Sequence, residues 1–261
     1  MNNQVTNAEH RERARKALSG KWGTMALLIF CGFLVRMIIS TLVGSVFPME
    51  SGSNGENLVS FLLNNLLFFA FTYGTYNAAL QVIRGRSVDI SLLTSIFRKE
   101  LYLPMLIINF IQYLVQLLVN LITLLPVLLT AGLTMYLGLM FNTVSVAQFQ
   151  NEMASDGLLA VVMLLFSLAL LLVGIFISGV FQFAVWIKLD QPNLGVGDIL
   201  RDAFGLMKGR FKQYFFLQLS FVGWYILGAM ALGIGLFWVI PYHDVAVASF
   251  YDSAQREKSP F

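Results

Sequence analysis

Cysteine and histidine are almost absent from this sequence. One cysteine, Cys31, and two histidines, His10 and His243, occur among its 261 residues. A single cysteine excludes a disulfide framework and a paired thiolate metal site. Neither histidine belongs to a metal-binding spacing such as H-E-x-x-H, and the sequence contains no G-x-S-x-G elbow and no phosphate-binding loop. We therefore expect a protein that is not an enzyme, with no catalytic residues, no metal and no other cofactor.

Charge is also scarce, since 12% of the residues are Asp, Glu, Lys or Arg whereas 57% are hydrophobic. An ordinary soluble domain has about 25% charged and roughly 45–50% apolar residues. Apolar runs of about 20 residues, the length of helix that crosses about 30 Å of hydrocarbon, recur along the whole chain. The composition predicts an all-α fold, a polytopic bundle of membrane helices in a single membrane domain.

Six membrane spans are predicted from the apolar runs. They lie at about residues 24–47, 58–83, 101–125, 158–187, 214–232 and 236–251, between a cytoplasmic N-terminal segment, 1–23, and a cytoplasmic tail, 252–261. The run from Leu101 to Phe141 is too long for one span and leaves almost no loop for two. We predict one crossing with a bend near Pro126, so that residues 127–141 either extend this helix in the outer leaflet or form a separate helix.

The basic residues are sorted by side of the membrane. Sixteen of the seventeen Lys and Arg residues lie in the N-terminal segment, the second and fourth polar gaps and the tail. The first and third gaps contain Glu50, Glu56, Glu152 and Asp156 but no cation. By the positive-inside rule the basic segments are cytoplasmic. We expect a multi-pass membrane protein with both termini in the cytoplasm, and the same sorting argues against nucleic acid as a partner.

Three short cytoplasmic helices are predicted beside the spans. The first, Asn7 to Ser19, begins with the capping-box residues Thr6 and Glu9. The others lie within residues 84–100 and 198–208, where apolar side chains share one helical face. Each is followed by a basic residue, an aromatic residue and an outward span. This pattern suggests a threefold repeat of one surface helix and one helical hairpin, although any outward span requires a similar anchor.

Seven short segments, mostly in the last third of the chain, form a recognisable set. They are Arg15 to Trp22, Leu189 to Pro192, Leu206 to Gly209, Leu217 to Trp224, Leu232 to Gly235, Pro241 to Tyr242 and Phe250 to Tyr251. Together they resemble the bacterial integral membrane family called domain of unknown function 975. The middle of the chain departs from that family, because Leu172 to Ile177 stands where members usually show Ile-Pro-Gly-Ile-Ile-Lys. The resemblance implies a multi-pass plasma-membrane protein, typically of Gram-positive bacteria, with no established activity.

Two charged residues fall inside predicted spans, Arg36 in the first and Asp244 in the sixth. Counted at 1.5 Å per residue, each is about 18 Å from the inner edge of the membrane. We predict that they pair, because an unpaired Arg near the bilayer centre costs roughly 2.5–3.5 kcal/mol. Gln112, Gln116 and Asn120, on one stripe of the third span, complete the candidate intramembrane polar cluster. The alternatives are a pair that only joins two helices, or an Arg36 that extends to the outer headgroups.

The leading functional hypothesis is a non-enzymatic organiser that interacts with membrane lipid, or with a membrane-protein partner, through its basic inner surface. Anionic headgroups attract each nearby cation by about 1 kcal/mol, and the candidate inner-surface contacts are Arg84, Arg86, Lys208 and Arg210. The alternative without a binding function is that these cations only determine how the protein is oriented in the membrane. The functional alternative is a small-solute transporter or channel component, in which the polar stripe of the third span lines a hydrated path.

Overall fold

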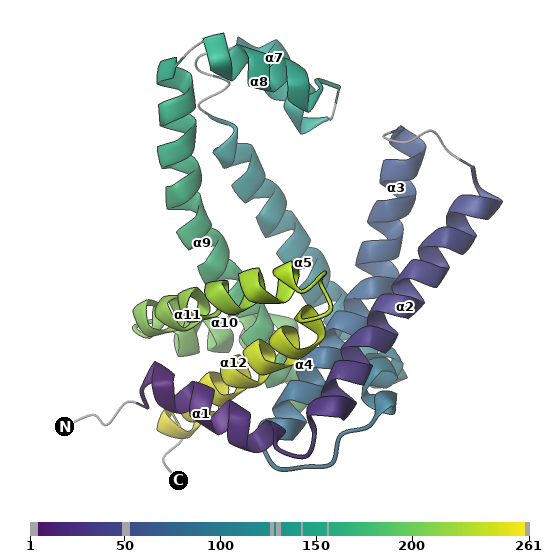
Figure 1. Cartoon of the computed structure of the whole chain (residues 1–261), viewed down its shortest axis with the longest axis vertical. Coiled ribbons are helices and arrows are strands. Elements are labelled where there is room, and N and C mark those ends of the chain that lie inside the picture. Colours follow the sequence, from purple (N-terminus) through teal and green to yellow (C-terminus); the bar gives the residue numbers. More distant parts are fainter. Residues whose placement is uncertain are drawn as a thin grey trace. The chain divides into compact units, whose positions relative to one another are not determined.

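A computed structural model describes residues 5–48, 53–125, 128, 132–141, 143–155 and 157–258. Over these residues the chain is helical and contains no strand (Figure 1), which confirms the predicted all-α fold. The elements in chain order are α1 (Asn7–Leu18), α2 (Trp22–Val46), α3 (Asn54–Leu62), the π-helical turn η1 (Leu63–Phe68), α4 (Phe69–Ile83), the 3-10 helix η2 (Ile90–Phe97), α5 (Lys99–Thr123), α7 (Gly132–Met140), α8 (Val146–Ser155), α9 (Gly157–Asp190), α10 (Val196–Met207), α11 (Phe211–Met230) and α12 (Leu236–Lys258).

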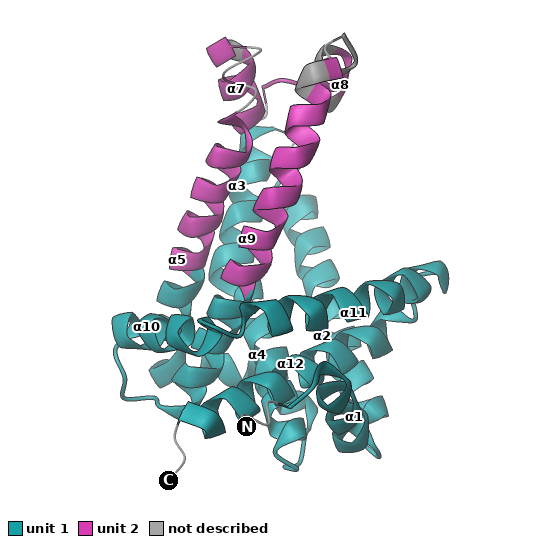
Figure 2. Ribbon diagram, turned by 90° about the vertical axis from the view of Figure 1, so that its left-hand side faces the viewer, with its two compact units in different colours: residues 1–109, 179–261 teal, residues 110–178 magenta. Residues whose placement is uncertain are grey.

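Four helices of the described chain are long and apolar enough to cross a membrane. They are Trp22–Val46, Asn54–Ile83, Lys99–Thr123 and Ala160–Asp190, and they coincide with the first four predicted spans. The predicted fifth and sixth spans correspond to α11 and α12, which are not among these four. In both views α11 runs across the direction of α3 (Figures 1 and 2). The count of six spans stays a prediction.

The chain divides into two compact units (Figure 2). Unit 2, residues 110–178, packs around the buried Met163, against which Leu124, Met135, Leu139 and Phe149 lie. Within the stretch 127–141, left open by the sequence, α7 is a helix separate from α5. Pro126, where we predicted the bend, lies outside the described residues.

Unit 1, residues 1–109 and 179–261, is packed around α12. This helix contacts α1, α2, α4, α10 and α11. Its face toward the end of α9 is aromatic: Phe250 and Tyr251 lie against Phe183, and Tyr251 also lies against Trp186, with ring centroids 5.2–6.1 Å apart. Such pairs contribute about 0.5–1.5 kcal/mol each beyond the area they bury. The core of unit 1 is therefore an aromatic contact between α9 and α12.

The N-terminal helix α1 begins with the predicted capping box. The Thr6 hydroxyl accepts from the Glu9 N–H at 3.3 Å, and the Glu9 carboxylate accepts from the Thr6 N–H at 2.6 Å. His10, one turn on, is buried and lies 3.0 Å from the Ser249 hydroxyl of α12. Burial, with Arg13 nearby, lowers the pKa of His10 to about 4. His10 is therefore neutral at pH 7 and docks α1 on α12.

Two of the predicted repeat junctions share one backbone conformation. Leu18 to Lys21 and Met207 to Arg210 are both type II turns, each closed by a hydrogen bond from the last N–H to the first carbonyl, at 2.8 and 3.0 Å. The third residue of each turn is a glycine with positive φ, 75° for Gly20 and 79° for Gly209. The junction before α5 has Arg98 and no glycine. The threefold repeat accordingly stays a prediction.

Candidate functional site

A polar cavity of about 360 Å³ lies in unit 1, where the end of α4 meets η2, the start of α5 and the loop after α9. Its polar lining residues are Asn77, Gln81, Arg84, Arg86, Ser95, Arg98, Glu100 and Asp190, and its apolar ones are Leu80, Leu92, Leu101, Leu189 and Pro192. A volume of roughly 300–1,000 Å³ is typical of small-ligand sites. We call this the arginine pocket.

One wall of the arginine pocket depends on a close contact between α4 and η2. A Cβ atom on Gly74 of α4 would lie 2.5 Å from the carbonyl oxygen of Leu93 and 2.8 Å from that of Leu92. The backbone of η2 therefore packs directly on α4 at this glycine. Leu93 and Ile96 are buried, so part of the apolar face predicted within residues 84–100 packs on α4.

A chain of hydrogen bonds runs from the rim of the arginine pocket to its buried end. Arg86 Nη1 donates to the Gln81 side-chain oxygen at 3.2 Å. Gln81 Nε2 donates to Asn77 Oδ1, and Asn77 Nδ2 donates to the Ser95 hydroxyl, both at 3.0 Å. Asn77 and Ser95 are buried. These bonds fix the side chains that a polar ligand entering the pocket would meet.

The opposite wall is an ion-pair network between α4, α9 and α12. Arg84, just after α4, donates through Nη1 and Nη2 to the two carboxylate oxygens of Asp190, at 2.6 and 2.8 Å. Its Nε donates to Asp252 at 3.3 Å. Tyr251 donates its hydroxyl to Asp190 at 2.9 Å. Bidentate arginine–carboxylate pairs are among the stronger hydrogen-bonded contacts, so this network joins three helices that are distant in sequence.

The network leaves the pocket with a positive rim. The hydrogen bonds that Arg84 donates to Asp190, together with the charges of Asp190 and Asp252, raise the pKa of Arg84 above its ordinary value, and the two carboxylates compensate its charge. Arg86 and Arg98 are exposed at the rim, with Glu100 as the acidic residue beside them. Two exposed guanidinium groups above neutral hydrogen-bonding side chains form a site suited to an anion.

The structure brings together two of the four predicted inner-surface contacts. Arg84 and Arg86 line the arginine pocket, whereas Lys208 and Arg210 do not. Lys208 is exposed at the turn between α10 and α11, and Arg210 donates to the Glu257 carboxylate at 2.9 Å. Sequence reasoning did not single out Arg98 as a site residue, although it belongs to the same basic segment as Arg84 and Arg86.

Arg36 has partners other than the predicted one. Among the ion pairs of the described residues there is none between Arg36 and Asp244. Its Nη2 donates to the carbonyl oxygen of Phe68 at 2.9 Å and to the hydroxyl of Thr72, and the guanidinium lies 5.6 Å from the centre of the Phe68 ring. Phe68 ends the π-helical turn η1, a geometry that often marks functional positions.

The other members of the predicted polar cluster lie elsewhere in the chain. Asp244 is buried, 3.3 Å from Nδ1 of His243, whose Nε2 lies 2.6 Å from the Gln218 side-chain oxygen. Gln112, Gln116 and Asn120 belong to unit 2, where Gln116 donates to Asn120 at 3.1 Å. At the start of the same stripe, Asn109 of unit 1 donates to Asn65 at 3.3 Å.

Comparison with known proteins gives a family but no function. A family model described as "Protein of unknown function (DUF975)" matches residues 1–258. The chain belongs to the DUF975 family. No curated protein and no solved structure matches it. The match confirms the resemblance seen in the sequence. It also covers the middle of the chain, where few segments resemble the family.

In this DUF975 protein one of the resembling segments forms part of the arginine pocket. Leu189, Asp190 and Pro192 line it, and Asp190 is the acceptor for both Arg84 and Tyr251. The buried Lys188 donates to the carbonyl oxygens of Pro192 and Leu194 at 2.5 and 3.0 Å. This contact closes the loop after α9 and holds Pro192 at the pocket.

Proposed function

We propose that this DUF975 protein is a non-enzymatic, multi-pass protein of the plasma membrane, with both termini in the cytoplasm, which organises or assists other membrane components. Its arginine pocket binds the anionic headgroup of a membrane lipid. The observation that carries the proposal is the convergence of Arg84, Arg86 and Arg98 on one cavity that also contains Asn77 and neutral side chains able to hydrogen-bond a phosphate. The transport alternative requires a continuous polar path along the third span, whereas Gln112, Gln116 and Asn120 are not among the residues that line the arginine pocket.

The apolar exterior supports the membrane part of the proposal. On α2 a series of large apolar side chains is exposed, and they are Leu27, Phe30, Phe33, Met37, Ile38, Leu42 and Val46. Soluble proteins rarely expose contiguous apolar patches beyond a few hundred Å². In a membrane these side chains lie against lipid hydrocarbon, so they are not exposed to water.

Removing the rim charges tests the headgroup proposal. We expect the Arg86→Gln/Arg98→Gln variant to bind a short-chain phosphatidylglycerol about 30-fold more weakly than the unaltered protein, since each cation contributes about 1 kcal/mol. The measurement is a calorimetric titration of the full-length protein in neutral detergent. Short-chain phosphatidylcholine, which has no net charge, should bind weakly to both proteins.

The matched control removes two cations away from the pocket. Arg201→Gln/Lys208→Gln loses the same charge from the exposed surface of α10 and its turn, and it should bind phosphatidylglycerol within about twofold of the unaltered protein. Equal losses in both double variants would show that the attraction is diffuse. An unaltered protein that does not distinguish the two lipids would contradict the proposed site.

The proposed topology can be tested with reporter fusions. Alkaline phosphatase fused after Lys258 should be inactive, because the N-terminal segment and the tail contain the cations expected to stay inside, and a fusion after Ser51 should be active. Six crossings further require an active fusion at Gly233, between α11 and α12. Active phosphatase after Lys258 would contradict the proposed orientation of the C-terminus.

A further inference from the structure

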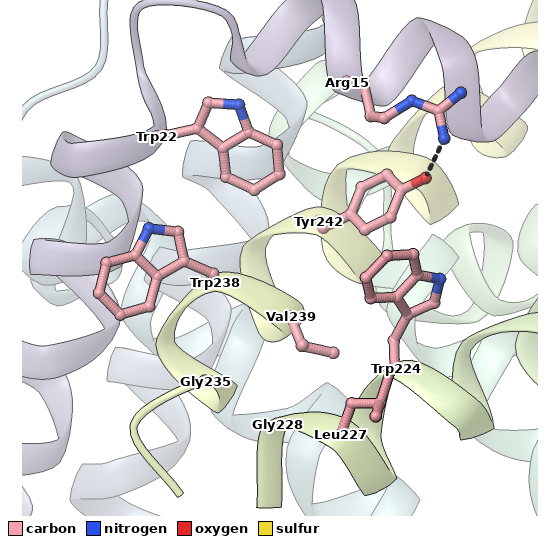
Figure 3. A pocket seen from close by; sticks show the side chains of 9 residues that line it. All are labelled: Arg15, Trp22, Trp224, Leu227, Gly228, Gly235, Trp238, Val239 and Tyr242. Atoms are coloured by element: carbon pink, nitrogen blue, oxygen red, sulfur yellow. Dashed lines mark hydrogen bonds between the residues drawn. The ribbon is translucent and has the colours of Figure 1, made fainter. Parts of the chain in front are cut away.

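A second cavity in unit 1 is lined almost entirely by apolar and aromatic side chains. Its volume is about 440 Å³, and it lies between α1, α2, α11 and α12. Three of the four tryptophans of the chain line it, Trp22, Trp224 and Trp238. Figure 3 shows Trp22 and Trp238 on one side and Tyr242 and Trp224 on the other. We call this the tryptophan pocket.

One end of the tryptophan pocket is polar. Arg15 of α1 donates through Nη1 to the hydroxyl of Tyr242 at 3.1 Å (Figure 3). The Tyr242 ring lies 6.0 Å from that of Trp22 and 6.1 Å from that of Trp224, centre to centre. Arg15 is exposed, and a guanidinium has five N–H donors of which this bond uses one. The cavity is therefore apolar along its length with one cation at its end.

The opposite end is formed by a contact between two glycines. A Cβ atom on Gly235 would lie 2.7 Å from Cα of Gly228, so α11 and the turn before α12 meet backbone to backbone. Leu227 and Val239 stand beside this contact (Figure 3). Without side chains on the two glycines, the space above the contact stays open.

The tryptophan pocket is continuous with an exposed apolar surface. Leu227 and Trp238, which line it, are 59% and 47% exposed. The hairpin tip beyond them exposes Met230 by 75% and Leu232 by 91%. Hydrocarbon chains next to this surface reach the cavity without crossing a polar barrier. Tryptophan and arginine together are typical of the boundary between headgroups and chains.

We propose that the tryptophan pocket binds one anionic phospholipid of the surrounding membrane, with an acyl chain among the tryptophans and the phosphate at Arg15. The apolar lining fits the chain, and the charge of Arg15 fits the phosphate. Moving a chain from bilayer to pocket gains little, because both are apolar. Selectivity therefore comes from the headgroup at Arg15. This site is separate from the arginine pocket, with which it shares no lining residue.

Lipids with brominated acyl chains provide a direct test, because bromine quenches tryptophan fluorescence on contact. The full-length protein is placed in phosphatidylcholine vesicles in which brominated phosphatidylglycerol or brominated phosphatidylcholine replaces an increasing fraction of the lipid. We expect half-maximal quenching at about a fivefold lower fraction of phosphatidylglycerol, which corresponds to about 1 kcal/mol for one cation. The buried Trp186 supplies emission that stays unquenched.

Three variants locate the effect. Arg15→Gln should abolish the preference for phosphatidylglycerol, whereas Lys16→Gln, the same loss of charge at an exposed position of the same helix, should retain it. Arg86→Gln/Arg98→Gln should also retain it, so failure here and failure of the arginine pocket are distinguishable.

Three results would overturn the proposal. Equal quenching by both lipids in the unaltered protein would mean that the tryptophans face the bilayer without selecting a headgroup. Absence of quenching by either lipid would mean that something other than lipid, such as a protein segment, fills the cavity. Loss of the preference in Lys16→Gln as well as in Arg15→Gln would assign it to the general charge of α1 and would also refute the site.

Discussion

Replacing Gly74 with alanine is expected to lower the thermal unfolding temperature of the protein by roughly 2–12 °C, which corresponds to about 1–3 kcal/mol of overpacking. The new Cβ atom would lie 2.5 Å and 2.8 Å from two carbonyl oxygens of η2, and backbone atoms cannot rotate away. The whole segment Ile90–Phe97 would have to move. Because Leu92 and Ser95 line the arginine pocket, phosphatidylglycerol binding should fall in the same variant.

The direction of this change is diagnostic, since alanine in place of glycine ordinarily stabilises a helix by about 1 kcal/mol. Gly44→Ala is the matched control, because Gly44 is also helical and a Cβ atom there would meet nothing within 4 Å. It should leave the unfolding temperature unchanged or raise it. Fluorescence-detected gel filtration after heating measures both variants in detergent. A Gly74→Ala protein as stable as Gly44→Ala would contradict the close contact between α4 and η2.

Replacing Arg84 with leucine is expected to destabilise the protein by about 2–3 kcal/mol. Removing one partner of a fully buried pair costs about 3–5 kcal/mol, and the side chains of Arg84 and Asp190 are 22% and 23% exposed, so water screens part of the loss. The variant leaves both Asp190 and Asp252 without the arginine. Asp190→Asn should cost less, because Arg84 keeps Asp252 as a partner.

The double variant Arg84→Leu/Asp190→Asn should recover part of the loss, since it removes the uncompensated carboxylate together with the arginine. Lys258→Gln is the control, because its pair with Asp202 is 47% and 40% exposed, and pairs of this kind contribute about 1 kcal/mol or less. Unfolding temperatures of the four proteins give the ranking. If Asp190→Asn were the more damaging single change, or the double variant the least stable, the network would not act as described.

The parts of the fold that were predictable from the sequence depend on residues close to one another in the chain. The capping box of Thr6 and Glu9 acts over three residues. The break between the predicted fifth and sixth spans, residues 233–235, contains Gly233, whose φ is 78°. Long apolar runs likewise predicted the four long apolar helices. For α11 and α12 the same reasoning predicts two further spans, and these stay predictions, since apolar content alone does not distinguish a lipid-facing helix from one packed in a protein core.

The candidate site was less predictable, because its parts are distant in sequence. Arg84 and Arg86 were singled out for their charge beside an apolar helix, but nothing local indicates that Asp190, 106 residues later, is the partner of Arg84. Arg36 shows a different difficulty. Depth along the membrane suggested a carboxylate partner, whereas the structure supplies a backbone carbonyl, a hydroxyl and a ring at the end of η1. A search of the sequence for opposite charges does not detect neutral partners of this kind.

The central place of α12 constrains the order in which unit 1 can be assembled. The contacts of α1, α2 and α4 with α12 join residues separated by more than 150 positions, so a ribosome completes those helices long before it makes their common partner. Until then His10 lacks Ser249 and Arg84 lacks Asp252. Contacts so distant in sequence form slowly, and partly made chains expose surface that is later buried. The core of unit 1 is therefore incomplete until the last helix of the chain has been made.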